Sequence, residues 1–361
     1  MSDQKKNSLL TILTGRAYRG RVVSYGIVLL SYVILELLMH TGNLSSLFTS
    51  LLVPVCCYIV AAIGLNLNVG ISGELNLGQA CFMSVGAFTA VCVSGSLATS
   101  IPAQVPRLVL AIIAGMLVAT VFGLLIGIPV LKLEGDYLAI VTLAFGQIIM
   151  SLITNMYLGI DEQGFHFSFV ENKVSLVPGG KMLLNGPMGA TGTERISTFT
   201  AGIVLILLAL LTVYHLIYSR SGRAIMAARD NRIAAESVGI NIVHTKLLAF
   251  ALSACFGGAA GALYGLNYST LVPAKFDFNT SILLLVYVVL GGLGNMTGTI
   301  IATVVLVLLP ELLRSMQDYR MLIYAIVLIL IMLITNNSRI RIWLQLQKSL
   351  WRKKAHGKQQ S

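Results

Sequence analysis

Residues 219–246 read SRSGRAIMAARDNRIAAESVGINIVHTK and form a polar, basic segment between two long apolar runs. The segment holds four arginines, yet it is rich in alanine and ends at Glu236-Ser237-Val238-Gly239. A loop that only joined two helices would need no more than a few residues. We therefore predict that the segment folds, as two short helices, and presents a surface on which a partner docks.

The rest of the chain is strongly apolar. Of its 361 residues, 56% are hydrophobic and 11% are charged, and the mean hydropathy is +0.85. A water-soluble domain could not cover so much apolar surface. Repeated apolar runs have the length, roughly 18 residues or more, that crosses a bilayer as a helix. The composition predicts an all-α, polytopic membrane protein and not a barrel.

The apolar runs predict about ten transmembrane helices. Those before the basic segment fall at 22–40, 46–65, 77–95, 108–130, 137–158 and 200–218. Those after it fall at 247–268, 281–293, 297–314 and 320–336. The transmembrane domain thus covers 22–336, between a basic N-terminus (1–21) and a basic tail (337–361).

The positive charges predict which segments face the cytoplasm. Five Lys/Arg residues lie in 1–21, five in 219–246 and seven in 337–361, together 17 of the 25. Clusters beside spans follow the positive-inside pattern and argue against nucleic-acid binding. With the N-terminus inside, six crossings return the chain to the cytoplasm at the basic segment. The loop 159–199, with only three Lys/Arg residues, is then external, as a docking site for a soluble partner or as a passive lid.

The region 281–314 is predicted to be two crossings and not one. A cytoplasmic tail requires an even number of crossings after the basic segment. Gly291-Gly292-Leu293-Gly294-Asn295 supplies a break between them. The first crossing is shorter than the roughly 20 residues that span a bilayer, which predicts a broken or partly re-entrant element buried among other helices.

Two groups of polar residues are candidates for lining a translocation pathway. The segment 64–79, GLNLNVGISGELNLGQ, contains Asn68, Glu74, Asn76 and Gln79 between two apolar runs. It is either a gate at membrane depth or a cytoplasmic turn with its caps. The second group lies within 137–158, where three polar residues are spaced four apart and so share one face of the helix: Gln147, Ser151 and Asn155. This polar stripe either lines an aqueous path or forms hydrogen bonds with neighbouring helices.

Small residues recur at every fourth position in three of the predicted spans. Such rows form grooves that let helices approach closely. They predict tight packing within the subunit or, alternatively, a subunit interface. The rows are Ala249, Ser253, Gly257, Gly261 and Gly265; Ala111, Gly115, Ala119, Gly123 and Gly127; and Gly86, Ala90 and Ser94.

Motifs for enzyme chemistry are missing from the sequence. It has no G-x-x-x-x-G-K-[ST], so the chain is not expected to hydrolyse ATP, and it has no G-x-S-x-G or H-E-x-x-H. The five cysteines and five histidines are scattered without metal-ligand spacing, so we expect no bound cofactor or metal. Glu36 is the only charged residue well inside a predicted span, which argues against an ion-coupled secondary carrier.

Four stretches resemble the permease subunits of bacterial branched-chain amino acid ABC importers, specifically those of the LivM type. They are GLNLNVGISGELNLGQACFMSVGA (64–87), LKLEGDYLAIVTLAFGQ (131–147), 219–250, and PAKFDFNTSILLLVYVVLGGLGNMTG (273–298). The resemblance runs through nearly the whole hydrophobic region. It implies the permease fold of these importers. The sequence differs from the family pattern at Glu74, where many relatives carry glutamine.

The resemblance implies a role for the basic segment. In ABC importers a cytoplasmic loop of the permease, with the pattern Glu-Ala-Ala and a glycine three residues after the glutamate, inserts into a groove on the ATPase subunit. This pattern maps onto Glu236, Ser237, Val238 and Gly239. The implied coupling loop also includes basic residues that can meet acidic groups on the ATPase, namely Arg223, Arg229 and Arg232.

The resemblance also implies partners and a mechanism. These are a homologous second permease of the LivH type, two ATPase subunits that use ATP and Mg²⁺, and a periplasmic amino acid-binding protein, all at the bacterial inner membrane. ATP would drive alternating access for leucine, isoleucine or valine. The alternatives are a related ABC importer for urea or short-chain amides and, in another class, an ion-coupled secondary amino acid carrier.

Overall fold

The computed structural model describes residues 16–42, 45–98, 100–132, 136–161, 164–169, 180–313 and 319–336. The predicted basic tail (337–361), residues 1–15 of the predicted basic N-terminus and parts of the loop 159–199 lie outside the described residues. The chain divides into two compact units, residues 1–304 and 305–361, which we describe separately.

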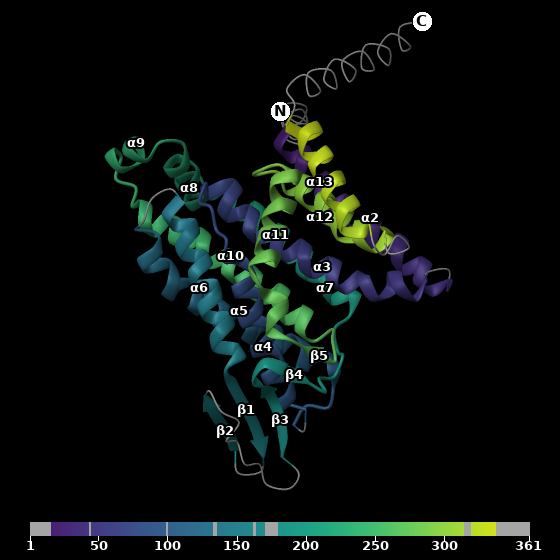
Figure 1. The fold of residues 1–361 in the computed structure, drawn as a ribbon. Coiled ribbons are helices and arrows are strands. Elements are labelled where there is room, and N and C mark those ends of the chain that lie inside the picture. Colours follow the sequence, from purple (N-terminus) through teal and green to yellow (C-terminus); the bar gives the residue numbers. More distant parts are fainter. Residues whose placement is uncertain are drawn as a thin grey trace, which may run out of the picture. The chain divides into compact units, whose positions relative to one another are not determined.

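The first unit is built from long apolar helices (Figure 1). They are α2 (Arg16–His40), α3 (Ser46–Asn66), α4 (Gln79–Ser96), α5 (Gln104–Val130), α6 (Asp136–Thr154), α7 (Phe199–Tyr218), α10 (Ile242–Gly265) and α11 (Phe278–Gly291). Among the described residues, eight helical segments are long and apolar enough to cross a membrane, and they match the first eight predicted spans. The polytopic all-α fold class is thereby confirmed.

The last two predicted spans are shorter helices. Helix α12 (Met296–Leu312) begins in the first unit, and α13 (Arg320–Asn336) belongs to the second. Each has 17 residues. Between α11 and α12 the chain breaks where the sequence predicted it, because Gly292 and Gly294 adopt φ angles of +92° and +77° that other residues rarely adopt.

Helices α4, α5 and α10 form the tightly packed centre of the first unit. All thirteen residues of the three small-residue rows are buried. A Cβ at Gly261 would lie 1.9 Å from the carbonyl oxygen of Met83, and one at Gly86 would lie 2.2 Å from that of Gly258. The rows therefore pack helix against helix within the subunit, as the first of the two interpretations predicted.

The predicted loop 159–199 contains strands that the sequence analysis did not anticipate. Strands β1 (Met156–Asp161), β2 (Gly164–Phe169) and β3 (Lys181–Asn185) form an antiparallel sheet in the order β2-β1-β3. A second ladder joins β4 (Ala190–Thr191) to β5 (Thr270–Leu271), and a 3₁₀ turn, η2 (Gly186–Met188), precedes it. Helix α6 ends at Thr154 and not at the predicted 158, because Tyr157 and Leu158 pair with β2 and β3.

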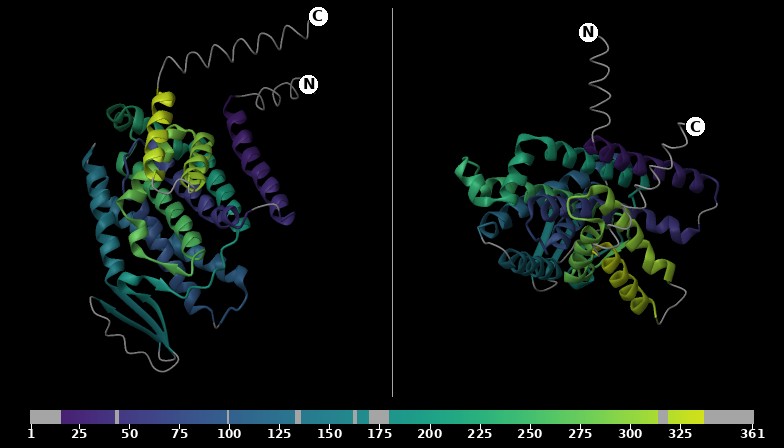
Figure 2. Two further views of the ribbon diagram at one scale, coloured as in Figure 1. Left: turned by 45° about the vertical axis from the view of Figure 1, so that its right-hand side comes forward. Right: turned by 90° about the horizontal axis from the view of Figure 1, so that it is seen from above.

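The basic segment and this sheet lie at opposite ends of the first unit. The segment folds into α8 (Arg220–Asp230) and α9 (Arg232–Ser237), and Figures 1 and 2 show both helices at the end away from β1–β3. Helix α6 runs down to the sheet, and β1 follows it directly (Figure 1). This arrangement agrees with the predicted placement of residues 219–246 and 159–199 on opposite sides of a membrane.

Candidate coupling and translocation site

The basic segment is folded by its own helix caps. Ser219 accepts a hydrogen bond from the Gly222 amide at 3.1 Å and so begins α8. Asn231 accepts one from the Ala234 amide at 3.0 Å and begins α9. Gly239, at φ +84°, follows the end of α9 in the left-handed conformation. The predicted pair of short helices is confirmed.

Helix α9 faces the protein with Ala235, and larger apolar residues in the helix and just after it face outward. Ala235 is buried in a small cluster with Ala228 and Ile242. Ile233 and Val238 are 81% and 75% exposed. A helix that exposes its largest apolar side chains to water is unfavourable alone, so this surface is suited to contact another protein.

The three arginines of the implied coupling loop each contact the chain itself. Arg232 pairs with Glu236 one turn later at 3.1 Å. Arg223 donates to the carbonyl of Tyr218 at 3.1 Å. Arg229 pairs with Asp230 at 2.8 Å and also reaches away from the segment, toward the end of α3. The arginine side chains thus stabilise the fold of the segment as well as giving it a basic surface.

Residues 64–79 continue α3 into a wider helical turn. After Asn66 the chain forms a π-helical turn, η1 (Leu67–Ser72), in which every residue is buried. Gly73 then adopts φ +77°, and an irregular stretch leads to α4. π-Helical turns are rare and are concentrated at functional positions.

The predicted pathway residues of this segment lie in the interior of the chain. Asn68, Asn76 and Gln79 are 0% exposed. Gln79 donates to the carbonyl of Ser253 on α10 at 3.2 Å and accepts from the Ser253 hydroxyl at 3.1 Å. Asn76 accepts from the Gly78 amide at 2.8 Å. Gln79 and Asn76 therefore fix the connection between α3 and α4, whereas both amide atoms of Asn68 lack a partner among the described residues.

Asn66, which was not among the predicted site residues, braces the end of α3 against α12. Its Nδ2 donates to the Thr299 hydroxyl at 2.7 Å, and its Oδ1 accepts from the Gly294 amide at 2.8 Å. The asparagine is fully buried. A single amide thus holds α3 to the break between α11 and α12.

Replacing Asn66 with alanine is expected to lower the free energy of unfolding by about 1–3 kcal/mol, since the Gly294 amide loses its acceptor and the buried Thr299 hydroxyl loses one of its two hydrogen bonds. Thermal unfolding of the purified protein in detergent measures the change. Thr212→Ala is the control, because the Thr212 hydroxyl bonds only within its own exposed helix turns. Equal unfolding temperatures for the two variants would contradict the role of Asn66.

Glu74 forms an ion pair with Lys246, at the last position of the basic segment. The two side chains are only 12% and 16% exposed, respectively. The pair joins the connection after η1 to the first turns of α10. Lys246 was missed as a site residue, because its partner Glu74 lies far away in the sequence.

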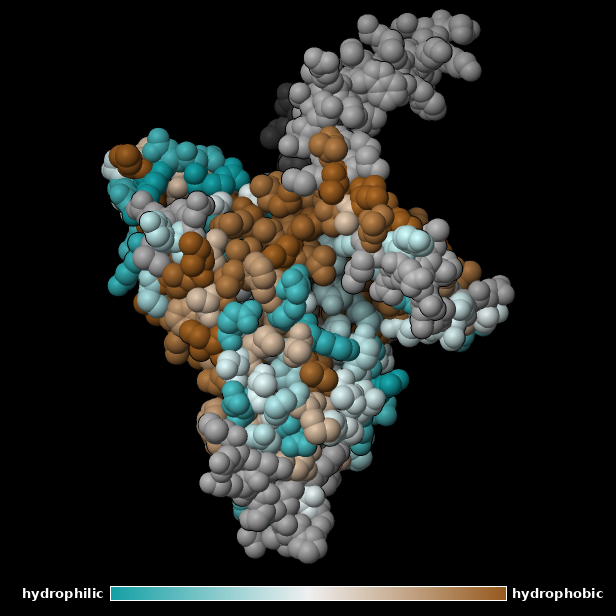
Figure 3. Space-filling model, in the orientation of Figure 1, coloured by the Kyte–Doolittle hydropathy of each residue, from teal (hydrophilic) through white to brown (hydrophobic). Residues whose placement is uncertain are grey.

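The stripe on α6 is exposed, in contrast to the polar residues of 64–79. Gln147, Ser151 and Asn155 all lie on the surface of this chain, and the Asn155 amide donates to the Ser151 carbonyl at 2.8 Å. Gln147 also lines a pocket with Asp277 and Ser281, at the start of α11. Figure 3 shows hydrophilic residues interrupting the apolar surface of the helices on this face. Polar side chains in a span are poorly matched to lipid and are suited to a protein or aqueous neighbour.

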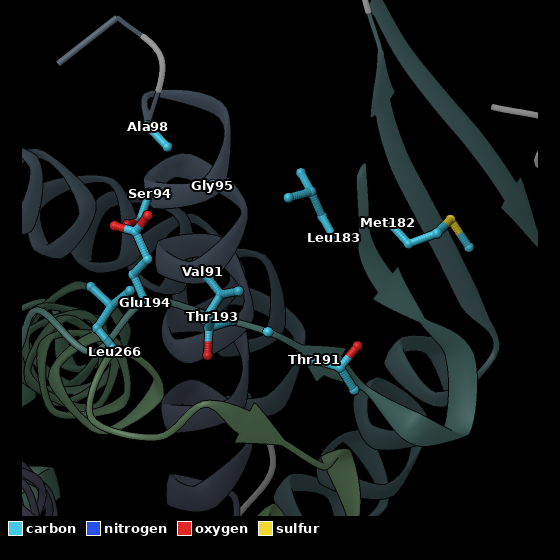
Figure 4. Close-up of a pocket in the computed structure, with 11 residues that line it drawn as sticks. Val91, Ser94, Gly95, Ala98, Met182, Leu183, Thr191, Thr193, Glu194 and Leu266 are labelled. Carbon is cyan, nitrogen blue, oxygen red and sulfur yellow. The ribbon is translucent and has the colours of Figure 1, made fainter. Parts of the chain in front are cut away.

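A second pocket lies near the sheet end, between α4, β3 and β4 (Figure 4). Glu194 and Ser94 line it together with Val91 and Leu266. Glu194 forms an ion pair with Arg107, whose side chain is 3% exposed at the start of α5. The pair ties the segment after β4 to the helices and keeps a buried cation neutralised.

The fold defines a multi-pass helical membrane protein with a folded, basic loop between two of its spans. The chain belongs to the family described as "branched-chain amino acid transport system / permease component", whose model matches residues 47–333. This match confirms the resemblance that the four sequence stretches indicated. No solved structure matches the chain.

Individual relatives are also named as permease proteins of branched-chain amino acid transport. The chain is 35% identical over 296 residues to the high-affinity branched-chain amino acid transport system permease protein LivM of Salmonella typhimurium and 33% identical over 294 residues to LivM of Escherichia coli. Each match covers 76% of this chain and 66%, slightly under two thirds, of the relative. The chain is also 30% identical over 179 residues to LivH of Escherichia coli. That match covers 46% of this chain and 58% of LivH.

Proposed function

We propose that this chain is a permease subunit of an ATP-driven importer for the branched-chain amino acids leucine, isoleucine and valine. The family supports the substrate class, and the similarity to both LivM and LivH supports a system with two permeases. The observation that carries the coupling to ATP is the α8–α9 element. It is capped at the start of each helix, ends at a left-handed glycine and exposes Ile233 and Val238 to a partner.

In this proposal the exposed residues of α9 enter a groove on an ATPase subunit. The apolar pair supplies the contact area, and Glu236, Ser237 and Gly239 shape the end of the helix. Arg223, Arg229 and Arg232 provide a basic surface for acidic groups on the ATPase. ATP and Mg²⁺ are bound and used by the two ATPase subunits, and this chain itself binds no cofactor.

The polar stripe on α6 is the proposed face toward the second permease and the pathway. Gln147, Ser151 and Asn155 are exposed within a span, where a protein or aqueous neighbour is favoured over lipid. Amino and carboxylate groups of a passing amino acid would find hydrogen-bond partners there, while the surrounding apolar residues suit its side chain. The buried residues Asn68, Asn76 and Gln79, together with the largely buried Glu74, would act behind this face as the gate.

The importer is proposed to lie in the bacterial cytoplasmic membrane with both termini of this chain in the cytoplasm. The element Ser219–Lys246 then faces the ATPases. The sheet end, with the Arg107–Glu194 pair, faces the periplasm, where an amino acid-binding protein delivers its ligand. ATP binding closes the ATPases, moves the element and opens the cavity outward, and hydrolysis resets it.

Co-purification followed by uptake tests the proposal. Expressed with its genomic neighbours, the tagged chain is expected to bring down a second permease and an ATPase subunit. The complex in proteoliposomes, with its binding protein and internal ATP, is expected to take up labelled leucine. Uptake without any ATPase would instead indicate a secondary carrier, and uptake of labelled urea in place of leucine would indicate the related importer class.

A further inference from the structure

The basic segment is fastened to the π-helical turn η1 by the side chain of Arg229. Its Nη1 donates to the carbonyl oxygen of Gly70 at 3.1 Å, across 159 positions of sequence. Its aliphatic stem packs on Gly73, where an added Cβ would lie 2.6 Å from Arg229 Cγ. Asp230 holds the same guanidinium from the other side, at 2.8 and 3.0 Å. The guanidinium is therefore anchored to η1 through one nitrogen, while the side chain stays 39% exposed.

A second link reaches the same region from the far end of the segment. Lys246 pairs with Glu74, which lies two residues beyond η1. Because both side chains are mostly buried, removing either would leave a charge with little access to water. The two links leave the segment at position 229, on α8, and at position 246, on α10, so that movement of the α8–α9 element together with the start of α10 displaces η1 or breaks a link.

The turn between the links has polar groups that the present conformation does not satisfy. Among the residues the structure describes, Asn68 Oδ1, Asn68 Nδ2 and Ser72 Oγ are buried without a hydrogen-bond partner. Unsatisfied buried groups are uncommon and cost free energy. Upstream, Asn66 anchors α3 to Gly294 and Thr299. The turn is thus fixed at its start, linked to the basic segment near its end, and holds unpaired buried polar atoms in between.

We propose that Arg229 and the Glu74–Lys246 pair transmit movement of the α8–α9 element to η1, and that they are positioning residues for transport. This inference rests on the proposed function, since the movement comes from the ATPase subunits. When α9 shifts, the Gly70 carbonyl and the Glu74 carboxylate are displaced with it. The turn then rearranges around the fixed Asn66 and gives Asn68 and Ser72 new partners.

The test compares amino acid uptake with ATP hydrolysis in the full complex, reconstituted in proteoliposomes with labelled leucine and its binding protein. Arg229→Ala is expected to lower the leucine imported per ATP hydrolysed by about tenfold, the factor that corresponds to one lost charge-assisted hydrogen bond, while hydrolysis continues. Arg229→Lys is expected to recover part of the ratio. Arg220→Ala, which removes an exposed arginine at the start of the same helix, is expected to keep the ratio unchanged.

The ion pair is tested by exchanging its charges. Glu74→Lys and Lys246→Glu are each expected to lower the ratio, and the double variant is expected to restore most of it, which a merely misfolded protein would not do. An unchanged ratio in Arg229→Ala, an equal fall in uptake and hydrolysis, or a double variant no better than the single ones would overturn the inference. If the wild-type complex shows no ATP-dependent uptake, the proposed function itself is wrong.

Discussion

A variant carrying Ile233→Glu and Val238→Glu is expected to fold in the membrane but to lose its ATPase subunits. The two side chains are 81% and 75% exposed, so neither supports the fold of this chain. Burying such an aliphatic side chain against a partner contributes about 1.5–3 kcal/mol. Two carboxylates in the same groove would cost more, because they would be buried without partners. The association is expected to weaken by at least about a hundredfold.

Co-purification of the ATPase subunit with the tagged permease measures this effect, with leucine uptake as the second readout. The matched control is His244→Glu, which adds the same carboxylate at an exposed position in the first turn of α10. A carboxylate there is favourable to the helix, since its N-terminus carries a partial positive charge. Wild-type co-purification of the double variant would show that α9 is not the docking surface.

Adding a single methyl group at Gly261 is expected to destabilise the centre of the first unit. In Gly261→Ala the new Cβ would lie 1.9 Å from the carbonyl oxygen of Met83, so α4 and α10 would have to separate. The small-residue rows leave no flexible side chain at this contact to move aside. Overpacking of this kind costs about 1–3 kcal/mol, and a lower unfolding temperature and poor recovery of intact protein are expected.

Gly26→Ala is the control for this variant, because a Cβ at Gly26 would have no atom within 4 Å. Alanine is favoured over glycine in a helix interior by about 1 kcal/mol, so this change is expected to be neutral or slightly stabilising. Thermal unfolding in detergent compares the two. A Gly261→Ala protein as stable as Gly26→Ala would contradict the close packing of α4 and α10.

Features that depend on local sequence were predictable. Apolar length located the spans, and glycines located the break after α11, because both act through residues that are near in sequence. The same holds for the two short helices of the basic segment, because the Asn231 cap and the left-handed Gly239 that bound the second of them are local features. The small-residue rows predicted close packing, although not which helices would meet.

Features that depend on distant residues were not predictable. The sheet β1–β3 follows a helical run without a turn signal, and Tyr157 and Leu158 become strand only because β2 and β3 are there to pair with them. The contact between Arg229 and Gly70 and the pair of Glu74 with Lys246 join segments more than 150 positions apart. Nothing in the local pattern distinguishes these charges from those of a solvated loop.

Gly70 also has a consequence for how this sequence can evolve. An added Cβ there would lie 2.0 Å from Asn66 Oδ1 and 2.3 Å from the Gly294 amide nitrogen, while its carbonyl already accepts from Arg229. Three separate parts of the chain therefore limit one position. A lineage could replace Gly70 only by changing Asn66 and the turn at Gly294 in concert, so divergence at these sites should be inherited as a block and not one residue at a time.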